Sequence, residues 1–450
     1  MFEMVRKCII ALPFVFVGSS LALAEDTPPE ESLVAANNAW MMTSSALVLF
    51  MTVPGLAMFY GGLVRRKNVL SVIMQCLFLM GMMTVLWGIC GYSFAFGGDN
   101  PYFGNGDYLF LKGIQMVDGD AVLSGGIHEL TFMVFQGMFF IITPALICGA
   151  VAERMKFSAM AVFMLLWGVL VYCPLCHWVW DGGILAHGGE SSIAGGALDF
   201  AGGTVVHISS GVSALVCAIF IGKRLGFGNE DMRPHNLTYT ALGAGMLWVG
   251  WFGFNAGSAG ASNSLAVNAF VVTHFSAAAG AVAWAIIEWI ANGKPSILGA
   301  ASGAVAGLVC ITPASGYVQP MPALIMGAAA GVVCYLGCTK IKGLFGYDDS
   351  LDAFGVHGIG GTLGAVLTGV FATTHVNPDA ANGIVYDSAE GVKLIIGQVA
   401  AVGVTAIFSV IMTMILLVLI NMTIGVRVAQ QTEISGLDVS EHGEEGYILF

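Results

Sequence analysis

The sequence predicts an all-α membrane protein of eleven transmembrane helices, and three observations lead to this prediction. The 450-residue chain is 57% hydrophobic and only 10% charged, whereas soluble domains usually carry about 25% charged residues. Apolar runs of about 20 residues, the length that crosses a bilayer, recur along the whole chain. Of the 61 glycines, many sit inside these apolar runs, which suits helices whose backbones approach closely.

The first residues have the composition of a cleaved signal peptide. Arg6 and Lys7 precede a short apolar stretch over 8–17, and a run of small residues ends at Ala24. The apolar stretch is too short for a span, so we expect cleavage after Ala24 rather than an uncleaved first helix. A signal peptide also places the mature N-terminus outside. The expected parts are a signal peptide over 1–24, a membrane domain over 25–426 and a cytoplasmic tail over 427–450.

Eleven apolar runs are expected to span the membrane, and an odd count puts the two ends of the mature chain on opposite sides. The expected spans cover residues 40–61, 69–96, 128–152, 156–178, 203–222, 237–258, 264–291, 296–313, 320–339, 354–373 and 392–424.

The charges between the runs test this count independently, because cytoplasmic connections are rich in Lys and Arg. After the signal peptide, all basic residues except Lys112 and Lys393 follow an odd-numbered span, whereas the connections after even-numbered spans are acidic. A wrong count would scramble this alternation. We therefore expect a multi-pass protein of the cytoplasmic (inner) membrane with its C-terminus in the cytoplasm. The net charge of −12 gives no support for nucleic-acid binding.

Two histidines in corresponding spans indicate an internal repeat. His207 lies in the fifth span after the run LDFAGG over 198–203, and His357 lies in the tenth after LDAFG over 351–355. An odd repeat unit of five helices inverts the topology of the second half. Transporters often hold their site at the midplane between such inverted repeats, so we expect a 5+5 inverted repeat plus a final helix.

Histidines are the main ionisable groups expected within the spans, and such groups are functional candidates by default. A neutral imidazole offers one donor and one acceptor, so two facing rings can bond each other and still present an edge to a small polar solute. The paired placement of His207 and His357 favours a pore lining. His274 has no counterpart, and we expect it to be a hydrogen-bonded core histidine.

Five segments together resemble the bacterial ammonium transporter family, the Amt type of the Amt/Mep/Rh superfamily. The resemblance runs in order from about residue 36 to the C-terminus. It implies a homotrimer with one pore in each protomer, transport of ammonium and methylammonium, and no enzymatic activity, cofactor or metal. The segments are 59–65 (FYGGLVR), 149–154 (GAVAER), 199–207 (DFAGGTVVH), 253–258 (GFNAGS) and 354–358 (FGVHG).

The resemblance also implies a role for individual side chains. Ammonium would be recruited at an outer site by aromatic faces and a hydroxyl, where cation–π contacts supply about 0.5–2 kcal/mol each. It would lose a proton near a phenyl gate, pass inward as ammonia with or without net charge movement, and regain a proton inside. The implied positions are Phe139, Trp180, Ser258 and Asp199 for the outer site, Phe139 and Phe254 for the gate, and His207, His357 and Trp251 for the pore.

Three further segments leave alternatives open. The tail over 427–450 is either a solvated acidic end or, by the resemblance, a docking segment for a cytoplasmic PII signalling protein, with Asp438, His442 and Tyr447 as its expected contacts. The loop over 188–196 looks longer than is usual in the family, and it is either a tolerated surface insertion or one that alters the outer vestibule. The run Cys173-Pro174-Leu175-Cys176-His177 matches the haem-attachment pattern C-x-x-C-H, but we expect no haem there, only free thiols or a disulfide.

Two other functions compete with transport. An ammonium receptor would sense the ion and signal through the tail, although this tail is shorter than an appended signalling domain. A gas channel of the Rhesus type would pass carbon dioxide, but the Asp199 and phenyl-gate segments resemble bacterial transporters more closely.

Overall fold

A computed structural model describes residues 30–448 of the chain, so the expected signal peptide lies outside the described residues. Within them, ten helices are long and apolar enough to cross a membrane, and they correspond to the expected spans one to five and seven to eleven. They cover Ser32–Leu63, Arg66–Phe96, Glu129–Val151, Phe157–Trp180, Gly203–Ile221, Ser264–Asn292, Ile297–Ala314, Pro320–Phe345, Phe354–Phe371 and Ser388–Thr423.

Most of these spans are built from successive helical segments, some of them wider π-type or tighter 3₁₀ turns (η). The order is α1 (Glu30–Phe50), η1 (Met51–Leu56), α2 (Ala57–Leu63), η2 (Arg66–Asn68), α3 (Val69–Leu86), η3 (Trp87–Gly91), α4 (Tyr92–Phe96), η4 (Leu109–Leu111), β1 (Leu123–Ser124), β2 (Ile127–His128), α5 (Glu129–Val151), α6 (Phe157–Trp167), η5 (Gly168–Tyr172), α7 (Cys173–Trp180), η6 (Ile193–Gly195), η7 (Gly203–Ile208), α8 (Ser209–Ile221), α9 (Leu237–Gly257), α10 (Ser264–Asn292), α11 (Ile297–Ile311), η8 (Thr312–Ala314), α12 (Pro320–Leu336), η9 (Gly337–Ile341), α13 (Lys342–Phe345), η10 (Phe354–Gly358), α14 (Ile359–Phe371), α15 (Ser388–Thr423), α16 (Gln430–Ser435) and α17 (Leu437–His442). The two short strands pair antiparallel.

The expected sixth span is α9, which has 21 residues. At 1.5 Å per residue it is about 31 Å long, close to the thickness of the hydrocarbon core. Its glycines, threonines, tryptophans and tyrosine lower its mean hydropathy, so α9 is not among the ten more apolar helices. It nevertheless packs within the bundle, against α1, α2, α10 and α11.

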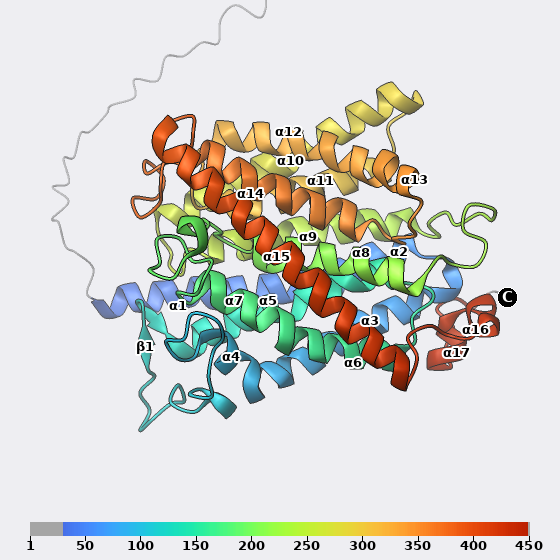
Figure 1. Ribbon diagram of the computed structural model, residues 1–450, viewed down its shortest axis with the longest axis horizontal. Helices are drawn as coiled ribbons and strands as arrows, with labels where there is room; N and C mark the ends of the chain where they lie inside the picture. The colour runs from blue at the N-terminus through green and yellow to red at the C-terminus, as the bar shows by residue number, and fades with distance from the viewer. Residues whose placement is uncertain (1–29, 449–450) are drawn as a thin grey trace, which may run out of the picture.

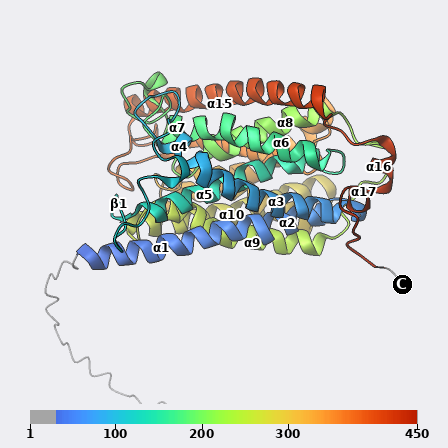
Figure 2. The same ribbon diagram turned by 90° about the horizontal axis from the view of Figure 1, so that it is seen from below.

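The long helices run side by side, and α15 crosses one face of the bundle obliquely (Figure 1). In the turned view α15 and α1 lie on opposite faces (Figure 2). The chain enters α1 at the end of the bundle that carries β1, and α16 and α17 lie at the other end. Following the orientation expected from the charges, we call these the outer and the inner end.

The first span begins farther out than the hydropathy pattern suggested, at Ser32 rather than at residue 40. Polar side chains in its first turns bond locally and to the outer loops, so the helix continues beyond its apolar run. Asn38 donates to the Val34 carbonyl oxygen, and Asn37 donates to that of Gly126. Hydropathy reports burial in lipid, not helix length, and so it missed these turns.

Glycines bring α10, α11 and α12 into direct backbone contact. A Cβ placed on Gly280 would lie 2.3 Å from the carbonyl oxygen of Gly303, and one on Gly307 would lie 2.3 Å from that of Ser276. From α12, a Cβ on Gly327 would lie 2.1 Å from the same Ser276 oxygen. No larger residue fits at these crossings, so the abundance of glycine reflects close helix packing.

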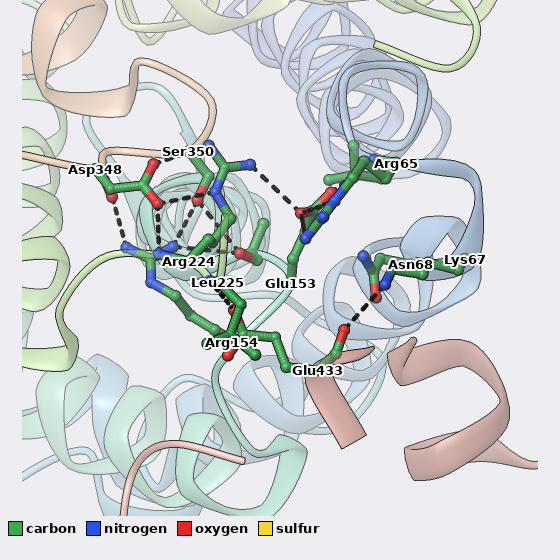
Figure 3. Close-up of polar contacts among 12 residues, drawn as sticks. Arg65, Lys67, Asn68, Glu153, Arg154, Arg224, Leu225, Asp348, Ser350 and Glu433 are labelled. Carbon is green, nitrogen blue, oxygen red and sulfur yellow. Dashed lines mark hydrogen bonds and ion pairs between the residues drawn. The ribbon is translucent and has the colours of Figure 1, made fainter. Parts of the chain in front are cut away.

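A buried ion-pair network joins the inner ends of the helices (Figure 3). Glu153, which follows α5, accepts hydrogen bonds from the backbone N–H of Arg65 at 2.6 Å and from its Nε at 2.7 Å. Arg224, which follows α8, lies 3.4 Å from Glu153 and makes a two-pronged contact with Asp348 at 2.8 and 2.9 Å. Burial alone would raise the pKa of Asp348, but the bonds and charge of Arg224 hold it below its usual value.

The tail packs against the inner ends of the helices (Figure 2). Asp438 accepts from the Ser71 N–H in the first turn of α3 at 2.8 Å, and Glu441 accepts from the Phe157 N–H at the start of α6 at 2.9 Å. Both carboxylates satisfy free donors at the positive ends of helices. The interpretation of the tail as a solvated acidic end is therefore wrong.

Glu433 fastens the start of the tail to two inner loops. Its carboxylate accepts from the Leu225 N–H at 2.7 Å and from Arg427 at 2.8 Å. Lys67 donates to the carbonyl oxygens of Glu433 and Ile434 at 3.1 and 2.6 Å. The tail and the loops that flank the inner network thus form one connected structure.

Candidate functional site

Two phenyl rings pack together towards the outer end of the bundle. Phe139 on α5 and Phe254 on α9 have ring centroids 4.3 Å apart, and each ring is 1% exposed. The Trp180 ring, at the end of α7, stands edge-on to Phe139 at 5.8 Å and is only partly buried. The three rings come from three helices, so packing of the bundle, not local sequence, brings them together.

Ser258 and Asp199 adjoin this aromatic group. The Ser258 hydroxyl donates to the carbonyl oxygen of Phe254 at 2.9 Å, one helical turn earlier, and the residue is partly exposed. The Trp180 indole N–H donates to the Asp199 carbonyl oxygen at 2.9 Å. The Asp199 backbone therefore fixes the Trp180 ring.

The Asp199 carboxylate caps the helix that carries His207. It accepts from the backbone N–H groups of Gly202, Gly203 and Thr204 at 2.8, 2.6 and 2.7 Å, and from the Thr204 hydroxyl. Gly202 has φ of 111°, a left-handed conformation that glycine adopts without a Cβ clash. The carboxylate thus supplies acceptors for three of the N–H groups that lack partners at this helix start, and Asp199 is only 5% exposed.

His207 and His357 lie directly inward of the phenyl rings. The Nδ1 atoms of His207 and His357 are 3.3 Å apart, and their rings lie 5.3 Å apart with planes inclined by 21°. His207 also stacks on Phe254 at 6.0 Å and on Trp251 at 5.5 Å. Trp251 is held in place by an indole hydrogen bond to Thr312 at 2.9 Å.

Two cavities adjoin the two histidines. A cavity of about 10 Å³ is lined by both histidines, by Trp251 and Phe254, and otherwise by apolar side chains; this is about the space that one water-sized molecule needs. A vestibule of about 270 Å³ opens at the inner end, with His357 at its depth and Asp352 and Glu288 in its walls. His357 lines both cavities and so stands between them.

The model of the Ammonium Transporter Family matches residues 39–447. This chain belongs to the ammonium transporter family. It is 46% identical to the ammonium transporter of Bacillus subtilis over 402 residues, which cover 89% of this chain and 96% of that relative. It is 43% identical to the ammonium transporter of Aquifex aeolicus over 445 residues, which cover 98% of this chain and all of that one.

Solved structures that resemble this chain include Amt and Mep2 proteins. Mep2 of Candida albicans matches with a TM-score of 0.80 and 31% identity over 89% of this chain and 88% of that one. A structure titled Sensor Amt Protein matches with a TM-score of 0.82 and 25% identity over 92% of this chain and 100% of that one. The named relatives of this family member are transporters, not enzymes.

His274 is not a core histidine, so that expectation is wrong. It lies on the exposed face of α10, and its ring contacts Trp248 at 5.4 Å and Phe252 at 6.2 Å. The sequence places it in the middle of an apolar run, where periodicity alone does not separate a buried from an exposed face.

Some residues of the site escaped the sequence reasoning. Phe135 packs edge-on against Phe139 at 5.1 Å and is 2% exposed. Its spacing of four residues from Phe139 puts both on one helix face, and that signal was available. Glu288, in the wall of the inner vestibule, lies within the seventh span and accepts from the Ser296 N–H at 2.8 Å.

The residues of the haem-like run over 173–177 make structural contacts within the protein. Cys173 and Cys176 are buried free thiols. The two His177 ring nitrogens face the carbonyl oxygens of Ala95 and Asn100 at 3.3 and 2.5 Å. Within residues 30–448, no three His, Cys, Asp or Glu side chains gather as a metal site.

The long outer loop and the tail residues pack against other parts of the protein. In the loop over 188–196, η6 packs on α15, with the Gly196 carbonyl oxygen against Gly397. Asp438 is 2% exposed. The His442 ring lies edge-on to Phe157 at 5.1 Å, and the Tyr447 hydroxyl lies 3.1 Å from Nε2 of His235.

Proposed function

We propose that this chain transports ammonium across the cytoplasmic membrane, releasing a proton near the phenyl rings and conducting ammonia past the two histidines. The observation that carries the proposal is the hydrogen-bonded pair of His207 and His357 directly inward of a closed aromatic barrier. A bonded imidazole pair in an otherwise apolar cavity offers a polar edge to a small neutral solute and no fixed charge to an ion.

Recruitment falls to the partly exposed Trp180 ring, the Phe139 ring beside it and the Ser258 hydroxyl. An ammonium ion leaving water needs replacements for its hydration, and aromatic faces and a hydroxyl oxygen supply them. Asp199 acts indirectly, because its carboxylate holds the helix start and its carbonyl oxygen holds Trp180.

Deprotonation follows from the cost of moving a charge through an apolar passage. A bare ion in such a place is strongly unfavourable unless it is paired. Ammonium avoids this cost by giving up a proton, passing as ammonia and regaining a proton in the wide inner vestibule. Potassium has no proton to give up and is excluded.

The assembly proposed for this function has eleven spans, with α9 as the sixth, in a 5+5 inverted repeat plus a final helix. Its N-terminus is outside after removal of a signal peptide over 1–24, and its C-terminus is cytoplasmic. The start of α1 and the tail lie at opposite ends of the bundle (Figure 1), which supports an odd number of crossings. The protein works as a homotrimer with one pore in each protomer.

Uptake of labelled methylammonium into proteoliposomes tests the proposal. We expect flux above that of empty vesicles, competition by ammonium and none by potassium. Vesicles containing the protein that take up no more than empty ones would overturn transport. An ammonium sensor would then be favoured, a role that the similarity to the Sensor Amt Protein supports. Ammonium-dependent protection of the tail from proteolysis, without flux, would identify that role.

Regulation by a trimeric PII protein is proposed for the tail. Asp438, His442 and Tyr447 hold the tail against the inner surface, so a partner that docks there must either cover this docked tail or release it. Binding of a purified PII protein to vesicles carrying the transporter, compared with a variant that ends at Arg427, is the direct measurement. Equal binding to both proteins would exclude the tail.

A further inference from the structure

The two halves of the pore begin with the same chain arrangement. Asp199 precedes His207 by the same number of residues as Asp349 precedes His357. Each histidine lies in a π-type turn, η7 or η10, and each turn continues into a helix of 13 residues, α8 or α14. The two halves therefore correspond when they are aligned by the number of residues between the aspartate and the histidine.

The Asp349 carboxylate caps its helix as Asp199 does. Its two oxygens accept from the backbone N–H groups of Ala353 and Phe354 at 3.1 and 2.8 Å. Asp349 is 1% exposed and does not line the inner vestibule. It therefore reaches the pore only through the turn that carries His357, three residues beyond Phe354.

The carbonyl oxygens of the two aspartates are also held in a corresponding way. The Trp180 indole donates to that of Asp199 at 2.9 Å, and the Lys342 ammonium group donates to that of Asp349 at 2.6 Å. Each capping loop is thus tied to a side chain at its own end of the pore. At the outer end this side chain is an aromatic ring, and at the inner end it is a cation.

Asp352 is not the counterpart of Asp199, although the similar runs over 198–203 and 351–355 suggested it. Its carboxylate forms an ion pair with Lys342 at 2.7 Å and lines the inner vestibule. Its backbone is left-handed, with φ of 59°. The similar residues in the two runs suggested the wrong alignment, because the two capping loops differ in length between the aspartate and the start of the helix.

We propose that Asp349 is the positioning residue for His357, which it holds in register with His207 by capping the first turn of η10. The inference rests on the proposed transport function. Without the carboxylate, two buried N–H donors lose their acceptor, and the first turn must unwind or rotate to find another. A residue in a helix turns by about 100° per position, so even a small change in this turn takes the His357 ring out of reach of the His207 Nδ1.

Three variants in proteoliposomes test this role: Asp349→Ala, Asp349→Asn and, as the matched control, Asp387→Asn. The control weakens a cap of the same kind on a helix without a pore histidine, because the Asp387 carboxylate accepts from the N–H groups of Ala389 and Glu390 at the start of α15. Methylammonium flux and the ratio of potassium to methylammonium uptake are measured per folded protein. We expect Asp349→Ala to lose at least tenfold in flux and to admit potassium, Asp349→Asn to retain part of both properties through its amide oxygen, and the control to keep the wild-type ratio.

A loss of folding alone lowers the amount of protein but leaves the selectivity of the remainder unchanged. An unchanged uptake ratio in Asp349→Ala would therefore overturn the proposal, and so would an equal effect of Asp387→Asn. If Asp349→Ala does not fold, the same criteria apply to Asp349→Asn. If the wild type itself shows no flux, the transport proposal fails independently of the capping proposal. The capping proposal is then tested by amide hydrogen exchange in residues 353–358. Unaltered exchange in Asp349→Asn would show that Asp349 does not control this turn.

Discussion

The Nδ1 atoms of His207 and His357 lie 3.3 Å apart, so one proton is shared between them, with one ring donating and the other accepting. A neutral imidazole carries a single N–H. The donating ring therefore has an acceptor at its Nε2 atom, and the accepting ring has a donor there. The Nε2 atom of His207 is buried, and no group of the described chain lies within hydrogen-bond distance of it. An unpaired polar atom in an apolar cavity is unfavourable, and a bound ammonia or water molecule would satisfy it.

His207→Ala is expected to lower methylammonium flux by about 5- to 150-fold, because it leaves the His357 Nδ1 without a partner at a cost of about 1–3 kcal/mol. Thermal unfolding of the purified protein should show that the variant still folds. His274→Ala is the control, since that ring lies on the exposed face of α10, away from the pore. Equal losses in the two variants would contradict a particular role for the pair.

Trp180→Leu is expected to raise the apparent KM for methylammonium by about 2- to 30-fold with little change in maximal flux. The lost cation–π contact corresponds to about 0.5–2 kcal/mol. Trp178→Leu is the matched control on the same helix, because its ring packs on Phe408 at 4.7 Å and its indole donates to the Tyr102 carbonyl oxygen at 2.5 Å. A lower maximal flux at unchanged KM for Trp180→Leu would place this ring outside recruitment.

The sequence predicted most of the fold, since hydropathy and the alternation of charge report directly where lipid and water lie. It also paired His207 with His357, because the two occupy corresponding spans. The capping residue of the second half was missed. The residues around Asp352 resemble those around Asp199, but it is Asp349 that lies as far from His357 in the sequence as Asp199 lies from His207. The docked tail was missed as well. Asp438 bonds to Ser71, 367 residues away, and no local pattern records a contact between two such distant polar groups.

Arg224→Ala is expected to destabilise the protein by about 3–5 kcal/mol, because it leaves the buried Asp348 carboxylate and one side of Glu153 without a partner. The pair with Asp348 is almost entirely enclosed, with the side chains 7% and 0% exposed. Thermal or denaturant unfolding measures the loss. Arg233→Ala removes an exposed pair with Asp231, 86% and 57% exposed, and no measurable change is expected there. Comparable losses in both variants would mean that the buried network adds nothing particular.

Transport is expected to fall as the pH drops through about 6, because Asp349 caps the His357 turn best when it is charged. Burial raises the pKa of Asp349 to about 6, against the opposing charge of Lys342. Asp352, Arg154 and Tyr60 are further ionisable groups whose charges act on it or respond to it. Roughly a tenth of the carboxyl groups are protonated at pH 7 and about three quarters at pH 5.5.

The sign of the stability effect separates this loss from unfolding. Since the folded-state pKa of Asp349 lies above its unfolded value, the folded state binds more protons between about pH 4 and 6, and this group makes the fold slightly more stable as the pH falls. Flux and thermal stability should therefore move in opposite directions with respect to Asp349. Asp349→Asn carries no titrating group, so its flux, although lower, should not change over this range. A wild-type flux that stays constant between pH 7 and 5.5, or a variant with the same decline as the wild type, would show that another group sets the pH response.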